Sequence, residues 1–175
     1  MLNFFKCRKV KSPTRAHPSD AGIDFAVPED LPYETMVSKN LHWTWSACNQ
    51  GFKREVDNIV TAFHVPPHER ILIPSGIHVN FPEGYALIAH NKSGVATKKG
   101  YGIMACVVDH GYSAEMHLGL VNTSNQIQII NAGEKILQFI LIKIGADQTE
   151  EMSSLEELYP EQTARGAGGF GSTGV

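Results

Sequence analysis

The chain has 175 residues and a formal net charge of −3, with 42% hydrophobic and 19% charged residues. These values are typical of one globular domain with its own core, and they provide no general attraction to nucleic acid or to an anionic membrane. No apolar run reaches the length of a membrane span, and the N-terminus lacks the apolar centre of a signal peptide, so the sequence predicts a soluble, cytoplasmic protein.

The three cysteines are Cys7, Cys48 and Cys106, an odd number without paired spacing. This pattern argues against a disulfide framework and against a zinc site. It is the cysteine usage of an intracellular protein.

The first polar segment in chain order is "SDAGIDFAV" at residues 19–27. Asp20 and Asp24 flank an Ala-Gly pair, which suits a turn that directs a carboxylate toward a cation or a hydrogen-bond network. Aspartates in turns also bond their own backbone, so this segment alone does not define a site.

Residues 33–64 hold both tryptophans, one cysteine and several charges, without a period of two. This composition predicts an insert that leaves the main sheet structure, with a short helix or a hairpin. The insert either packs onto the body of the domain or provides a surface for a partner protein.

Beyond the insert, the chain is dominated by apolar runs of strand length. Turn-forming tripeptides such as "PSG", "PEG" and "NAG" separate the runs. Regularly spaced strands with almost no helical period predict an all-β jelly roll or β-barrel, and a short helix is expected only at 153–159. The predicted strands are 70–81, 85–91, 103–110, 115–124, 127–131 and 135–145.

Two segments within this β-region carry chemistry. "HNKSGVATKKG" at 90–100 offers the Lys92 cation, the Ser93 hydroxyl and the unhindered N–H groups around Gly94, which together suit a phosphate, although a solvated lysine-rich loop has the same composition. "CVVDHGYSAE" at 106–115 places Asp109 directly after an apolar strand, where it can act as a general base toward water, and Tyr112 beside it.

Gln138 lies within the apolar run of "NAGEKILQFIL", where a buried amide must find hydrogen-bond partners. It therefore either stabilises the fold or orients a site. The chain ends in "RGAGGFGSTGV" at residues 165–175, whose glycines expose backbone N–H groups. This tail is either a frayed end or an arm that becomes ordered around a phosphate-containing ligand.

Taken together, the five segments resemble the five ordered motifs of the trimeric dUTPase family: "SDAGIDF", "HNKSGVA", "CVVDHGYSAE", "GEKILQFI" and "RGAGGFGSTG". The resemblance implies a jelly-roll domain over residues 1–164 and a flexible arm at 165–175 that closes over a neighbouring active site. It also implies a homotrimer with active sites shared between chains, dUTP as the substrate, and no nucleic-acid or membrane partner.

The resemblance assigns the roles of individual residues. Asp109 would activate the water that attacks the α-phosphorus and releases dUMP and pyrophosphate, Tyr112 would pack under the deoxyribose, and Asp24 would orient waters around Mg²⁺. The main chain of a hairpin from Gly102 to Val107 would read the uracil edge. The expected substrate-binding residues are Lys92, Ser93, Gly94, Gly102, Ile103, Cys106, Val107, Tyr112, Gln138, Arg165, Gly168, Gly169, Phe170, Ser172 and Thr173.

The motifs also depart from the family pattern. Lys92 replaces an arginine and so lacks a bidentate fork, Cys106 and Ala114 replace glycines, and Gly111 replaces an acidic residue. A relaxed-specificity dNTP pyrophosphatase is therefore one alternative, and a dCTP-deaminase-like enzyme is a second, disfavoured by Gly94 and Asp109. The third alternative is a regulatory protein that uses the 33–64 insert to bind a partner.

Overall fold

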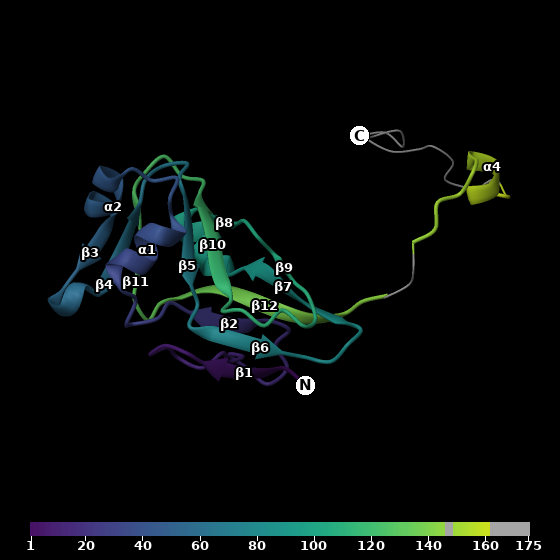
Figure 1. The fold of residues 1–175 in the computed structure, drawn as a ribbon, viewed down its shortest axis with the longest axis horizontal. Coiled ribbons are helices and arrows are strands. Elements are labelled where there is room, and N and C mark those ends of the chain that lie inside the picture. The colour runs from purple at the N-terminus through teal and green to yellow at the C-terminus, as the bar shows by residue number, and fades with distance from the viewer. Residues whose placement is uncertain (146–148, 162–175) are drawn as a thin grey trace. The chain divides into compact units, whose positions relative to one another are not determined.

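The computed structural model describes residues 1–145 and 149–161 (Figure 1). Residues 1–144 form one compact unit, and the chain from Gly145 onward belongs to a second unit, which is described by itself. No described helix is long and apolar enough to cross a membrane.

The compact unit consists mainly of short strands. Its helical segments are α1 (Tyr33–Lys39), α2 (Trp45–Gly51), α3 (Ser93–Lys99) and a 3-10 turn, η1 (Val56–Asn58). The strands are β1 (Asn3–Lys6), β2 (Ile23–Ala26), β3 (Phe52–Arg54), β4 (Val60–Val65), β5 (Arg70–Pro74), β6 (Ile77–Asn80), β7 (Tyr85–Asn91), β8 (Tyr101–Ile103), β9 (Val107–Val108), β10 (His117–Asn122), β11 (Gln128–Asn131) and β12 (Lys135–Lys143).

The strands form small antiparallel sheets, which confirms the all-β jelly-roll prediction. Their orders are β2-β12-β7-β9, β5-β10-β8, β11-β4-β3 and β1-β6. The core lies between these sheets because alternate strand residues point inward: Leu137 and Phe139 of β12 are buried, and the ring of Phe139 lies 4.6 Å from that of Phe25 on β2. Burying such a pair of aromatic rings is a principal source of stability.

Two of the apolar runs are divided in the structure. The 70–81 run turns at Ser75–Gly76 into β5 and β6; Gly76 has φ +73°, a conformation that favours glycine. The 103–110 run is not one strand, and the hairpin expected over Gly102–Val107 is not formed. Strand β8 pairs with β10, whereas β9 pairs with β7, so the intervening residues cross from one sheet to another.

The insert packs onto the sheets. Tyr33, Met36, Trp43, Cys48 and Phe52 are buried, and the Trp43 ring stacks on that of Phe52 at 5.1 Å and 16°. The Trp43 indole N–H donates to the carbonyl of Arg70 at the start of β5 over 3.0 Å. Buried aromatic area and a satisfied indole N–H together anchor the insert.

The insert is shorter than the predicted range of 33–64. Val60, Phe63 and Val65 of β4 are fully buried, and β4 pairs with both β3 and β11 (Figure 1). Residues 60–64 therefore belong to the domain core, and the insert ends at 59. The sequence "VTAFHV" places apolar residues at irregular spacing, so its period did not reveal the strand.

The predicted C-terminal helix is present as α4 (Leu155–Leu158) within the second unit. The Ser154 hydroxyl accepts a hydrogen bond from the Glu157 N–H at 3.1 Å and so caps the first turn of this helix.

Candidate active site

The Asp24 carboxylate on β2 is the centre of a charged cluster. The residue is only 7% exposed. Its Oδ1 atom lies 2.7 Å from Lys92 Nζ, and its Oδ2 atom lies 3.3 Å from Lys135 Nζ. One buried carboxylate is thus shared by two lysines, which offsets the cost of removing its charge from water.

A polar row crosses the four-stranded sheet beside this cluster. Gln138 of β12 pairs directly with Asp24 of β2 on one side and with His90 of β7 on the other. Residues directly opposite one another in an antiparallel ladder share a face, so the three side chains lie on one face of the sheet. The His90 Nε2 atom is buried and has no hydrogen-bond partner among the described residues.

Gln138 is held in place by its surroundings. Its amide Nε2 donates to the carbonyl oxygen of Asn91 at 2.7 Å. A Cβ atom on Gly22 would lie 1.9 Å from the Gln138 Oε1 atom. The absence of a side chain at Gly22 therefore allows the amide to approach the main chain of the first motif. The Gln138 side chain is partly exposed rather than buried, and its bond to Asn91 satisfies one of its polar groups.

The second motif follows β7 and begins α3. Lys92 precedes this helix, and Ser93 is its first residue. Ser93 and Gly94 are exposed, and a Cβ on Gly94 would meet nothing within 4 Å, so the backbone here is open to a ligand. The Lys92 side chain, in contrast, is bonded to Asp24 rather than extended into solvent.

The third motif presents Asp109 and Tyr112 on an exposed turn after β9. The Tyr112 N–H donates to the Asp109 carbonyl at 3.2 Å, and the Tyr112 hydroxyl donates to the Glu115 carbonyl at 3.4 Å. The Asp109 carboxylate has no hydrogen bond or ion pair with any residue in the described ranges. A solvated carboxylate of this kind can accept a proton from water.

Glu115 ties this turn to the N-terminal segment. Its two oxygens accept from Arg8 at 2.7 and 3.0 Å, and Oε1 also accepts from the Gly76 N–H at 2.8 Å. Burial acts to raise the pKa of the Glu115 carboxyl, but these hydrogen bonds to Arg8 and Gly76 hold the pKa below its ordinary value. Burial lowers the pKa of nearby His117.

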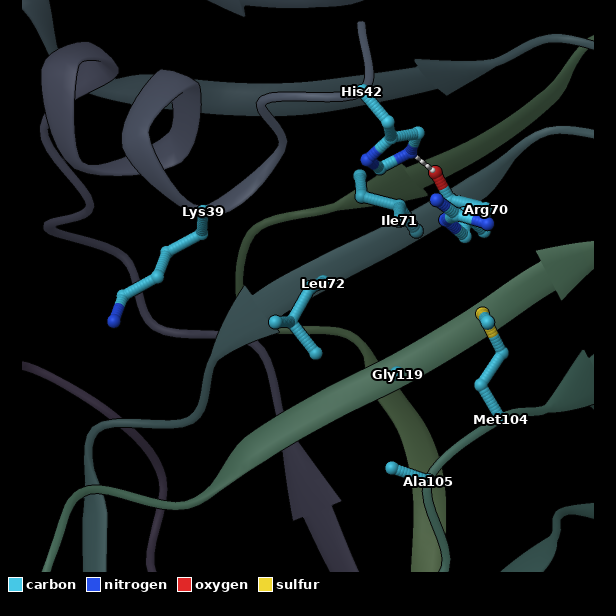
Figure 2. A pocket seen from close by; sticks show the side chains of 8 residues that line it. All are labelled: Lys39, His42, Arg70, Ile71, Leu72, Met104, Ala105 and Gly119. Atoms are coloured by element: carbon cyan, nitrogen blue, oxygen red, sulfur yellow. Dashed lines mark hydrogen bonds between the residues drawn. The ribbon is translucent and has the colours of Figure 1, made fainter.

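A pocket of about 430 Å³ opens beside the crossing segment (Figure 2). Its floor combines β5 and β10 with Met104 and Ala105, and its rim carries side chains of the insert. The His42 ring contributes a nitrogen 2.8 Å from the Arg70 carbonyl. The lining residues are Lys39, His42, Arg70, Ile71, Leu72, Met104, Ala105 and Gly119.

The predicted base-reading residues border this region. Gly102 and Ile103 belong to β8 and pair with Val121 and Leu120 of β10. Val107 pairs with Ile88 on β7. The Cys106 carbonyl accepts from the Ala89 N–H at 2.7 Å, which fixes the main chain at the far side of the crossing.

The Asp24 cluster and Asp109 lie at opposite ends of β7. Val108 pairs with Leu87, whereas Asn91 is the last residue of β7 and precedes Lys92. The step from Leu87 to Asn91 spans roughly 13 Å along a strand. Since β9 runs antiparallel to β7, Asp109 continues away from Asn91 and the separation increases further.

The fifth motif lies outside the described residues. This applies to the expected ligands Arg165, Gly168, Gly169, Phe170, Ser172 and Thr173. Within the described ranges, no group of three or more His, Cys, Asp and Glu side chains could hold a metal ion. The one buried carboxylate of the cluster, Asp24, fits an ion whose direct ligands are phosphate and water oxygens, as Mg²⁺ accepts in nucleotide sites.

The family model described as dUTPase matches residues 58–174, that is 117 of the 175 residues. The chain belongs to the dUTPase family. The matched range begins just before β4 and holds the second to fifth motifs, whereas the first motif at 19–27 precedes it.

Curated relatives named deoxyuridine 5'-triphosphate nucleotidohydrolase include one from Finegoldia magna, 39% identical over 110 residues, which are 62% of this chain and 73% of the relative. The relative from Hydrogenobaculum sp. is 35% identical over 122 residues, covering 69% of this chain and 79% of its own length. The relative from Nocardia farcinica is 32% identical over 168 residues, covering 94% and 79%.

Solved dUTPases share the fold of this chain. The Staphylococcus bacteriophage 80alpha dUTPase with dUpNHpp has a TM-score of 0.70 and 20% identity, covering 100% of this chain and 99% of that one. The dUTPase from phage phi11 of S. aureus has a TM-score of 0.64 and 18% identity, covering 89% and 98%.

Sequence reasoning missed three residues that the structure brings to these sites. Lys135 joins Asp24, His90 lies beside Gln138, and Glu115 supports the turn that carries Asp109. All three fall inside the quoted motifs, but none differs in type from an ordinary solvated polar residue. Only the pairing of distant strands shows that they are neighbours of the site.

Proposed function

We propose that the protein hydrolyses dUTP to dUMP and pyrophosphate. The observation that carries this proposal is the convergence of the first, second and fourth motifs on Asp24, Lys92 and Gln138, while the Asp109 carboxylate of the third motif is left exposed. Membership in the dUTPase family, and relatives named for this activity, support the same reaction. The bacteriophage 80alpha relative, which was solved with dUpNHpp, supports dUTP as the ligand class.

The proposed active site is shared between the chains of a homotrimer. Asp109 and Lys92 of one chain lie at opposite ends of β7, so residues from a second chain are needed to complete a site. An apolar row on the outer face of the same sheet supports this assembly: Val107 is 59% exposed and pairs with Ile88, which pairs with Ile140. Burying such a row against another copy is favourable.

In this assembly, the tail of residues 165–175 closes over a neighbouring site. Phe170 stacks on the uracil, because an aromatic face accepts a planar base. Arg165, Ser172, Thr173 and the N–H groups of Gly168 and Gly169 hold the phosphates.

The chemical step is attack of water on the α-phosphorus. Asp109 accepts the proton of that water at its carboxylate, and the bond from the α-phosphorus to the bridging oxygen breaks so that pyrophosphate leaves. Lys92, Ser93 and Gly94 bind the phosphates and align the leaving group, since positioning and charge stabilisation dominate phosphoryl transfer. When bound, Mg²⁺ would neutralise part of the triphosphate charge, and the Asp24 carboxylate would accept hydrogen bonds from the waters around the ion.

Base recognition is assigned to the main chain between Gly102 and Val107. The adjacent pocket supports this assignment, because Met104 and Ala105 of the crossing segment form part of its wall. Tyr112 packs under the sugar. Cys106 occupies the position where the family has glycine, so discrimination against a 5-methyl group is the property most sensitive to this chain's own sequence.

The experiment is pyrophosphate release with Mg²⁺ from dUTP, dTTP, dCTP and UTP. We expect release from dUTP alone. Asp109→Asn should reduce the rate of this release about 10²- to 10⁴-fold, the usual effect of removing a general base. Asp57→Asn is the matched control, because Asp57 is exposed in the insert and has φ +63°, which asparagine tolerates. Equal release from dTTP would support relaxed specificity, and no release from a folded oligomer would favour a partner-binding role.

A further inference from the structure

We propose that Lys135 is a positioning residue that balances the charge of Asp24 while Lys92 moves to the triphosphate. This inference rests on the proposed function, in which Lys92 binds phosphate. It assigns a role to a lysine of β12 that lies three residues before Gln138, and it explains why one buried carboxylate has two cationic partners.

The geometry of the two ion pairs carries the proposal. Lys92 Nζ is 2.7 Å from Oδ1 of Asp24, and Lys135 Nζ is 3.3 Å from Oδ2. The two ammonium groups therefore engage different oxygens, and removal of one does not displace the other. The Lys135 Nζ atom also lies 3.4 Å from the Thr14 hydroxyl, whose residue pairs with Asp24 through both backbone groups.

The position of Lys92 allows its ammonium group to move from Asp24 to a bound phosphate. It immediately precedes the exposed backbone of Ser93 and Gly94, and its side chain is 28% exposed. A triphosphate bound at that backbone offers several negative oxygens in place of one carboxylate, so the Lys92 ammonium is attracted away from Asp24. Lysine suits this exchange because its charge sits on a flexible stem without a fixed bonding plane.

Asp24 cannot be left alone when Lys92 moves. Its side chain is 8% exposed, and an unpaired carboxylate at such a position carries a large desolvation cost. With Lys135 present, the carboxylate keeps one partner throughout the exchange. Without Lys135, every Lys92 ammonium that binds phosphate would leave the buried Asp24 carboxylate without a lysine partner, with only the water shell of Mg²⁺ beside it, and substrate binding would be weakened accordingly.

A double-mutant cycle on binding of dUpNHpp, the unhydrolysed analogue, tests this role. We expect Lys135→Met to raise Kd about tenfold in the wild-type background but less than about twofold in the Lys92→Met background, where no exchange occurs. Lys135→Arg, which keeps the charge, should restore a Kd within about threefold of the wild type. Lys9→Met is the matched control: it removes a lysine 3.2 Å from the Glu29 carboxylate, outside the site, and should leave Kd unchanged.

Thermal unfolding of each variant is measured alongside, and Lys135→Gln replaces Lys135→Met if the latter does not fold. Equal effects of the Lys135 substitution with and without Lys92 would overturn the proposal, because Lys135 would then contact the phosphate directly. A change in stability without a change in Kd would also overturn it. Wild-type protein that binds no dUpNHpp would reject the proposed function itself, an outcome distinct from both.

Discussion

The regions around Asp24 and Asp109 differ in how far a single chain completes them. Asp24 is buried, engaged by two lysines and aligned with Gln138 across the strand ladder. Asp109 lies on an exposed turn, and its carboxylate forms no hydrogen bond or ion pair with another described residue. Both carboxylates belong to motifs of one proposed reaction. A single chain therefore supplies the partners of the proposed binding residue Asp24 but not those of the proposed general base Asp109.

This difference follows from where each residue lies on the sheet. Asp24 is inside a strand that pairs along its length with β12, so neighbouring strands supply its partners. Asp109 follows a two-residue strand at the sheet edge. The turn after it is supported by the bond from Tyr112 to Glu115 and by the His110 ring, whose nitrogen lies 2.8 Å from the Phe81 carbonyl oxygen. Strand β2 is also an edge strand of this sheet, but the backbone of Thr14 pairs with Asp24 on its outer side. Strand β9 pairs with β7 and with no second strand among the described residues, so its outer edge is available to another subunit.

The largest expected effect is restored activity when two inactive variants are assembled together. Asp109→Asn and Lys92→Met, each expected to lower kcat/KM about a hundredfold or more, place their defects at opposite ends of β7. If each site takes Asp109 and Lys92 from different chains, about a third of the sites are intact in every trimer that contains both variants. Pyrophosphate release from co-expressed, doubly tagged oligomers measures this fraction.

The control for co-assembly is a chain that carries both substitutions, mixed with the Asp109→Asn chain; it supplies no intact Asp109 and should stay inactive. If the two single variants remain inactive together, Asp109 and Lys92 act within one chain and the contrast between the two regions has no functional basis.

A smaller effect is expected from Gly22→Ala, which tests whether the Asp24 region is as fixed as its contacts indicate. The new Cβ would lie 1.9 Å from Gln138 Oε1, so the amide must move and lose its bond to Asn91. We expect KM for dUTP to rise about fivefold and stability to fall by about 1 kcal/mol, the value of one hydrogen bond. Steady-state kinetics and urea unfolding measure the two quantities.

Gln138→Ala is the reference for this substitution. In that background, Gly22→Ala should change neither KM nor stability, because the side chain with which it collides is absent. An equal rise of KM in both backgrounds would show that Gly22 acts through the main chain rather than through Gln138.

The smallest effect on activity is expected at Glu115, which supports the turn of the open region and acts on stability instead. Glu115→Gln keeps the shape of the side chain but removes the charge that binds Arg8, and should lower the free energy of unfolding by roughly 1–3 kcal/mol at pH 7. Since the folded state holds the pKa of Glu115 below its unfolded value, the stabilisation is complete above the unfolded pKa and is lost as pH falls through the folded pKa.

Urea unfolding of both proteins between pH 7 and pH 3.5 measures this difference. The curves of wild type and variant should converge toward the acid end. Glu83→Gln, at an exposed turn before β7, is the matched control and should follow the wild type at every pH. A gap between Glu115→Gln and wild type that is independent of pH would mean that the ion pair contributes nothing.

The sequence predicted much of the sheet structure because strand signals are local. Run 85–91 is β7, and α4 lies within the range of 153–159 predicted for a short helix. The motifs likewise identified Asp24, Lys92 and Gln138, which the structure brings together. The prediction of one strand at 103–110 was wrong, because these residues cross from one sheet to another. The choice of partner strand is not encoded in the local sequence.

Local sequence patterns could not predict the helices of the insert or the contact between Lys135 and Asp24, for the same reason. Helix α1 is seven residues long, too short for a clear helical period, and it is held by burial of Tyr33 and Met36. Lys135 reads as a solvated lysine at the start of a strand. Its proximity to Asp24 depends on the register between β12 and β2, which are separated by more than a hundred residues.

The burial of Cys48 allows the opening of the insert to be measured by thiol modification. Cys48 lies in α2 and is 1% exposed, whereas the thiol of Cys7 is exposed. Burial also raises the pKa of the Cys48 thiol, so it is unreactive in place. The rate at which a disulfide reagent modifies Cys48, timed against the prompt reaction of Cys7, therefore counts how often α2 separates from the sheets beneath it.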